Sequence, residues 1–180
     1  MKRLLFALSL VVVLGFGCAQ KKGELSVTPV DTKTESAGVY TNTQYGFEVT
    51  LPTGVEAKPR VEDDRQTEYL GFPVDFFVSI RDTVIDPKTV VNLAYVYASP
   101  DLTVDGLVAA LEKSSAQVKV KTREVMDVNG VEVTKLVSTT EAGEDKTHYV
   151  FQGKDAMIVM SVFLNLTENF TPIIGSLKML

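Results

Sequence analysis

The chain has 180 residues, of which 18 are Lys or Arg and 23 are Asp or Glu, so its formal charge is −5. An acidic chain is a poor candidate for nucleic-acid binding, because such binders need a basic face to neutralise phosphates. It holds one cysteine and one histidine, which excludes an internal disulfide and a histidine–cysteine metal site. We therefore expect no nucleic-acid partner, no cofactor and no bound metal.

The N-terminus has the pattern of an export signal. Residues 4–16 are almost wholly apolar, they follow Lys2 and Arg3, and a polar run begins at Gln20. A basic segment, an apolar segment and small residues before a cut are typical of a secretory signal peptide. The apolar run is shorter than the ~18–20 residues that cross a bilayer comfortably. The pattern therefore predicts a signal peptide over residues 1–17 and not a permanent transmembrane helix.

The signal ends in Gly15-Phe16-Gly17-Cys18, with Leu14 directly before it. This segment resembles a bacterial lipobox, in which signal peptidase II cuts before a cysteine that then carries lipid. The resemblance implies cleavage between Gly17 and Cys18 and acylation of Cys18 with fatty chains such as palmitate. Two or more chains anchor a protein stably, whereas one does so only marginally. Ordinary signal-peptidase cleavage at these small residues is the alternative.

Residues 18–38 are polar and lack periodic apolar spacing, so we expect the lipidated cysteine followed by a flexible tether. About 20 random-coil residues span about 25 Å, enough to hold a domain just off a membrane. We expect an exported protein that is lipid-anchored in the bacterial cell envelope. Ala19 follows the cysteine where an inner-membrane retention signal would have Asp, which favours the outer membrane, facing the periplasm, in a Gram-negative cell. In a Gram-positive cell the site would be the outer face of the plasma membrane.

A folded domain is expected over residues 39–180. Two strand-like runs surround Asn42-Thr43-Gln44 and predict a hairpin. Tyr40, Tyr45-Gly46-Phe47 and Leu51-Pro52-Thr53-Gly54 resemble the opening of the PsbP-like domain family, which includes DcrB-like bacterial envelope lipoproteins. Val55 stands where the family usually has Trp. The resemblance implies a sheet with helices on both faces and a role as an accessory subunit.

The middle of the chain contains further elements. The charge-rich residues 55–66 are expected to be a solvated loop, because their carboxylates lack the spacing of a calcium site. Residues 90–98 are apolar on both faces, which indicates a central strand. A helix should follow, capped by Thr103, with Leu102 and Leu107 as a hydrophobic staple.

The strongest local signal is Asn129-Gly130, which predicts a type I′ turn between two long strands. This turn sets three cross-strand pairs, two of them apolar and one of opposite charge. They are Val128–Val131, Met126–Val133 and Glu124–Lys135.

Strands are expected over residues 147–152 and 156–165, and a helix follows. Pro172 fits best as its first residue, with Thr171 as the cap; Thr167 is an alternative cap. The element order predicts an α+β fold with a single twisted antiparallel β-sheet and helices packed on it. The resemblance to PsbP-like domains implies that the helices lie on both faces.

His148 is the only histidine, and on a strand it is more often a satisfied or solvent-facing residue than a catalyst. The scattered carboxylates could include an acid–base pair, but on loops and turns they are more often there for solubility. The sequence shows no nucleophile elbow, phosphate loop or metal-binding motif. We expect no enzyme and no catalytic residue. The leading hypothesis is a non-catalytic envelope lipoprotein that binds another envelope protein at the membrane surface. A carrier or sensor for a small apolar ligand is the second, and a hydrolase that uses His148 is the third.

Overall fold

The computed structural model describes residues 38–59, 68–74, 76–82, 91–115, 117–162 and 166–180. The predicted signal peptide, the predicted Gly17–Cys18 cleavage site and the predicted lipidation of Cys18 lie outside these residues. Within the described part of the chain, no helix is both long and apolar enough to cross a membrane.

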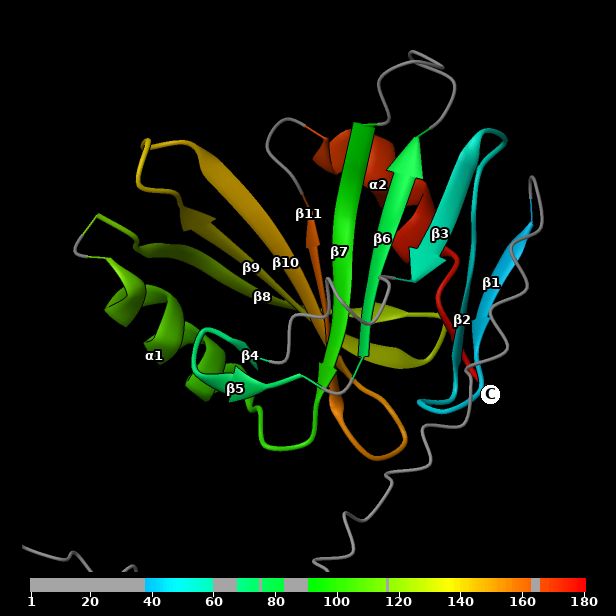
Figure 1. Ribbon diagram of the computed structural model, residues 1–180, viewed down its shortest axis with the longest axis horizontal. Coiled ribbons are helices and arrows are strands. Elements are labelled where there is room, and N and C mark those ends of the chain that lie inside the picture. Colours follow the sequence, from blue (N-terminus) through cyan, green and yellow to red (C-terminus); the bar gives the residue numbers. More distant parts are fainter. Residues whose placement is uncertain (1–37, 60–67, 75, 83–90, 116, 163–165) are drawn as a thin grey trace, which may run out of the picture.

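The strands form three sheets (Figure 1). The largest has seven strands in the order β3-β6-β7-β11-β10-β9-β8, and each neighbouring pair is antiparallel. Its strands are β3 (Val55–Pro59), β6 (Phe76–Asp82), β7 (Val91–Ser99), β8 (Val120–Val128), β9 (Val131–Thr139), β10 (Asp145–Gln152) and β11 (Met157–Val162).

A second sheet joins the two ends of the described chain. It consists of β1 (Val39–Asn42), β2 (Phe47–Thr50) and β12 (Lys178–Met179), with β2 in the middle. The short strands β4 (Glu68–Tyr69) and β5 (Phe72–Pro73) make a two-stranded ribbon. Two helices complete the described chain, α1 (Val104–Ser114) and α2 (Thr167–Gly175).

The large sheet separates two hydrophobic clusters, because alternate residues of each strand point to opposite faces. On what we call the α2 side, Phe170 and Ile173 of α2 and Phe47 of β2 pack with Met160 and Val96 of the sheet. The cluster on the opposite face, which we call the α1 side, is smaller. There, α1 and the sheet contribute a separate cluster of buried residues, namely Leu107, Leu111, Tyr97, Leu136, Val150 and Val159. Figure 1 shows α2 behind β6 and β7, and α1 beside β8.

The predicted fold class is wrong. The described residues are mostly β, and they form three sheets where a single sheet with helices packed on both faces was expected. The helices have only 11 and 9 residues, and part of the α2 side is covered by the three-stranded sheet. The reason is a long-range pairing: Lys178 lies opposite Glu48, and a two-residue strand has no periodicity that the sequence could reveal.

Two local predictions also fail. The start of the charge-rich segment is strand β3, whose Val55 and Ala57 are buried against the core. Helix α2 begins at Thr167, so Pro172 lies inside it and not at its first position. The Thr171 hydroxyl does not cap the helix, but donates to the Thr167 carbonyl at 2.8 Å.

The Asn129-Gly130 prediction is confirmed. Both residues have positive φ, +53° and +83°, as a type I′ turn requires. The predicted pairs Val128–Val131, Met126–Val133 and Glu124–Lys135 are the observed register of β8 and β9. The Thr103 cap is also observed, since its side chain accepts a hydrogen bond from the Gly106 N–H at 3.0 Å.

Candidate functional site

His148 lies at the centre of a polar row on the α1 side of the sheet. Strand register places it directly opposite Ser161 of β11, while Ser138 of β9 lies on its other flank. The His148 Nδ1 atom is 2.8 Å from the Ser161 hydroxyl, and Nε2 is 3.2 Å from the Ser138 hydroxyl. All three side chains are buried. The solvent-facing alternative for His148 is therefore excluded, and both ring nitrogens are hydrogen-bonded.

The surroundings of His148 favour its neutral form. Burial lowers the pKa of the imidazole from 6.5 to about 3, and the positive charge of Lys146 lowers it in the same direction. A neutral ring has one donor and one acceptor nitrogen, and a serine hydroxyl can partner either. The ring is thus uncharged and satisfied at neutral pH.

This geometry is unsuited to acid–base catalysis. A general base works best when its pKa lies near the working pH, and the pKa of His148 lies far below it. In a catalytic triad a carboxylate orients the imidazole, whereas here Nε2 of His148 is hydrogen-bonded to the Ser138 hydroxyl and Nδ1 to that of Ser161. Both serine hydroxyls are inside the protein, where a substrate does not reach them. The arrangement links three neighbouring strands, β9, β10 and β11.

The polar row continues onto β7 and β6. Ser161 lies opposite Tyr95, and Tyr95 lies opposite Ser79. The buried Ser79 hydroxyl makes no hydrogen bond to any described residue. In the next row, the ring centres of Tyr97 and Tyr69 are 4.5 Å apart, and burial, aided by Tyr69, raises the pKa of Tyr97 well above 10. Polar groups of Ser161, Tyr95 and Ser79 therefore continue across the α1 side, next to the apolar cluster to which Tyr97 belongs.

The residues behind the family resemblance have structural roles. The Asn42 side-chain carbonyl accepts from the Tyr45 N–H at 3.0 Å and shapes the β1–β2 turn. Gly46 has φ +70°, a conformation that suits glycine. The Lys154 N–H donates to the Tyr45 carbonyl, and the Leu180 N–H donates to the Gly46 carbonyl, each at 2.9 Å. This turn therefore fastens the N-terminal hairpin to the β10–β11 turn and to the C-terminal segment.

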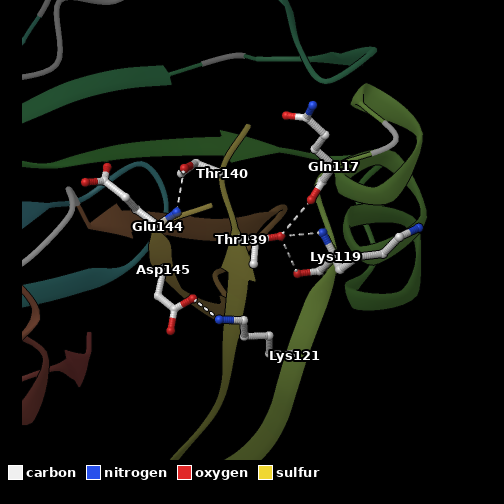
Figure 2. Close-up of polar contacts among 7 residues, drawn as sticks. All are labelled: Gln117, Lys119, Lys121, Thr139, Thr140, Glu144 and Asp145. Atoms are coloured by element: carbon white, nitrogen blue, oxygen red, sulfur yellow. Dashed lines mark hydrogen bonds and ion pairs between the residues drawn. The ribbon is translucent and has the colours of Figure 1, made fainter. Parts of the chain in front are cut away.

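A second group of polar contacts holds the ends of β8, β9 and β10 (Figure 2). The Thr139 hydroxyl accepts from the Lys119 N–H at 2.8 Å and donates to the Gln117 carbonyl at 3.0 Å. Lys121 forms an ion pair with Asp145 across this end of the sheet. Both side chains of the ion pair are about half exposed, so it contributes little to stability. The contacts fix strand ends and do not converge on one point where a ligand would bind.

Metal-ligating groups do not gather in the described residues: His, Cys, Asp and Glu form no cluster of three or more there. The predicted site residues Gly17 and Cys18 are outside the described part of the chain. Sequence reasoning singled out His148 but missed Ser138 and Ser161. The separations of 10 and 13 residues carry no motif, and only the pairing of three strands brings these side chains together.

The fold is similar to that of a solved PsbP structure. The computed structure is similar to the solution structure of cyanobacterial PsbP (CyanoP) from Synechocystis sp. PCC 6803, with a TM-score of 0.50 and 14% sequence identity. The match covers 81% of this chain and 95% of the cyanobacterial one. No family model matches the chain, and no curated protein is significantly similar to it in sequence. The comparison thus supports a likeness in fold to PsbP, although the expected single sheet with helices on both faces is not observed.

Proposed function

We propose that this chain is a bacterial envelope lipoprotein that presents a non-catalytic PsbP-like domain to another envelope protein at the membrane surface. The export signal and Cys18 support the anchor, and the PsbP-like fold is compatible with an accessory role. The observation that carries the non-catalytic part is the state of His148. It is the chain's only histidine, and it is buried, neutral and hydrogen-bonded through both nitrogens.

The anchor is tested on the mature protein from native membranes. Mass spectrometry should find an N-terminal Cys18 that carries acyl chains, and the Cys18→Ala chain should leave the membrane fraction. Cys18 supplies the only thiol in the chain, so the substitution removes the acceptor and little else. An unmodified N-terminus at Cys18 or Gln20 would contradict lipidation.

The protein-binding role is tested by crosslinking in intact cells, followed by purification of the full chain. A reproducible envelope protein should be recovered with the wild type and with a His148→Gln variant, because the proposed role does not use the imidazole. Failure to recover any reproducible partner from wild-type membranes would count against the role. An activity that His148→Gln abolishes in a folded protein would revive the hydrolase hypothesis.

A further inference from the structure

Strand β8 is a long, exposed edge of the seven-stranded sheet. Among the described strands it pairs with β9 alone, and it has nine residues. Residues 121–125 and Asp127 are exposed. Among them is Val125, a large apolar side chain with 59% of its surface exposed. An edge of this length offers a row of backbone groups to which another strand can add.

The Asn129-Gly130 turn decides which backbone groups face outward. In a two-residue hairpin, the residues that flank the turn, Val128 and Val131, form a hydrogen-bonded pair. Backbone direction alternates along a strand, so Met126 and Glu124 also direct their N–H and C=O groups toward β9. The intervening residues Val125, Asp127 and Arg123 then direct theirs toward the open edge.

The same three residues share one face of the strand, and their charges are arranged symmetrically. Arg123 is positive, Asp127 is negative, and the apolar Val125 lies midway between them. Suppose a second β8 adds antiparallel with Val125 opposite its own counterpart. Arg123 of each copy then lies opposite Asp127 of the other, which gives two cross-strand pairs of opposite charge.

Arg123 and Asp127 already make contacts within the chain. Arg123 pairs through Nη1 with Asp105 of α1, and one carboxylate oxygen of Asp127 accepts from the Gly130 N–H. Each contact uses only one of the polar atoms at the end of the side chain. A guanidinium and a carboxylate can both engage a second partner.

Other registers of two such strands are less favourable. A pairing centred on Glu124 instead of Val125 sets Glu124 opposite Glu124 of the second copy. A pairing centred on Arg123 sets Arg123 opposite Arg123. Like charges directly opposite destabilise a strand pair. A pairing centred one residue after Val125 places Asp127 opposite Val125 and loses both Arg–Asp pairs.

We propose that β8 is a self-association edge, on which β8 of a second copy adds antiparallel about Val125 and joins two sheets into one. The charge pattern of Arg123, Val125 and Asp127 is self-complementary, which selects a second copy over an unrelated strand. The pairing would also give hydrogen-bond partners to the outward backbone groups. It stands independently of the envelope partner proposed above.

The test uses cysteine crosslinking of the full chain in its native membranes. In the proposed register the two Val125 Cα atoms are about 5.5 Å apart, within reach of a disulfide. A Val125→Cys chain should form a disulfide-linked dimer under mild oxidation. Lys121→Cys is the matched control, since it is exposed on the same strand yet lies eight residues, about 27 Å, from its own counterpart in this register. Both chains keep Cys18, so dimers formed through that residue would be equal in the two.

A charge swap tests the register. Arg123→Asp should lower the dimer fraction of the Val125→Cys chain, with the association constant falling roughly tenfold, because both ion pairs become repulsive. Adding Asp127→Arg to that variant should restore dimerisation, since the swapped pattern is again self-complementary. Equal crosslinking of Val125→Cys and Lys121→Cys would overturn the proposal. So would adducts of Val125→Cys with a different protein in place of a dimer, or failure of the double swap to restore the dimer.

Discussion

The two faces of the seven-stranded sheet are held by different interactions. The α2 side is packed with apolar and aromatic side chains. Among them are Phe47 and Phe151, whose rings pack edge to face with their centroids 5.5 Å apart. The α1 side has a smaller apolar cluster, and next to it the polar row of His148, Ser138 and Ser161 crosses the strands. Apolar burial supplies stability without direction, whereas buried hydrogen bonds are specific but contribute less. We infer that the α2 side contributes most of the stability and the α1 side fixes strand register.

The largest effect should come from a change on the α2 side. Phe47→Ala removes a fully buried ring that also contacts Tyr40. The free energy of unfolding should fall by about 3–5 kcal/mol, as for other large-to-small changes of buried aromatic residues. Urea unfolding followed by circular dichroism measures this. Val39→Ala is the control, because Val39 belongs to the same sheet but is about half exposed, and its effect should stay within about 0.5 kcal/mol.

On the α1 side the effect should depend on pH. The pKa of His148 is about 3 in the folded protein and near 6.5 when unfolded. Below pH 6.5 the unfolded chain binds a proton that the folded protein does not, so stability is lost as the pH falls toward 3. The loss should be about 1.4 kcal/mol per pH unit.

A His148→Gln variant isolates this contribution, because the amide can bond serine hydroxyls but does not titrate. Its unfolding free energy, measured by urea between pH 7 and 4, should decline less steeply than that of the wild type. Carboxylates titrate in both proteins, and only the difference between the curves is attributed to His148. Parallel curves would show that the imidazole is not held neutral by the fold.

A smaller effect is expected where the N-terminal hairpin meets the β10–β11 turn. A Cβ at Gly153 would lie 3.0 Å from the Tyr45 carbonyl oxygen and 3.1 Å from that of Ala156. Gly153→Ala should therefore cost about 1–3 kcal/mol, the usual range for overpacking. Gly175→Ala is the matched control, since a Cβ there meets no atom within 4 Å. Equal losses in the two variants would contradict the close approach.

The smallest effect concerns the cap of α1. Thr103→Ala removes the acceptor for the Gly106 N–H and should lower the unfolding free energy by about 1 kcal/mol. Thr103→Ser keeps the hydroxyl and should restore most of the loss. Thermal unfolding of the two variants side by side checks this. A loss as large as that of Phe47→Ala would break the proposed ranking of the two faces.

The parts of the fold that follow from local chemistry could be predicted from the sequence. Asn129-Gly130 dictates a turn, and the turn dictates the register of β8 and β9. Thr103 ends one segment and begins a helix because its hydroxyl replaces a missing backbone acceptor. In each case the residues that decide the structure are neighbours in the chain.

The remaining features depend on partners far away in the chain. Nothing near Lys178 indicates that it will lie opposite Glu48, and nothing near His148 identifies Ser138 and Ser161 as its partners. Helix α2 begins five residues earlier than Pro172 predicts. Its Phe170, Ile173 and Ile174 pack into the α2 side, and tertiary packing of this kind overrides a local preference.

The small sheet also constrains the order of events during folding. Strand β2 is flanked by β1, which precedes it directly, and by β12, which follows every other described strand. The sheet at the base of the proposed tether is therefore completed last in synthesis. The β1–β2 hairpin lacks its third strand, β12, until the C-terminal segment has been made. If the chain is exported from its N-terminus, as we propose, this closure takes place only after translocation has brought residues 178 and 179 across. Closing so long a loop is slow compared with forming a local hairpin.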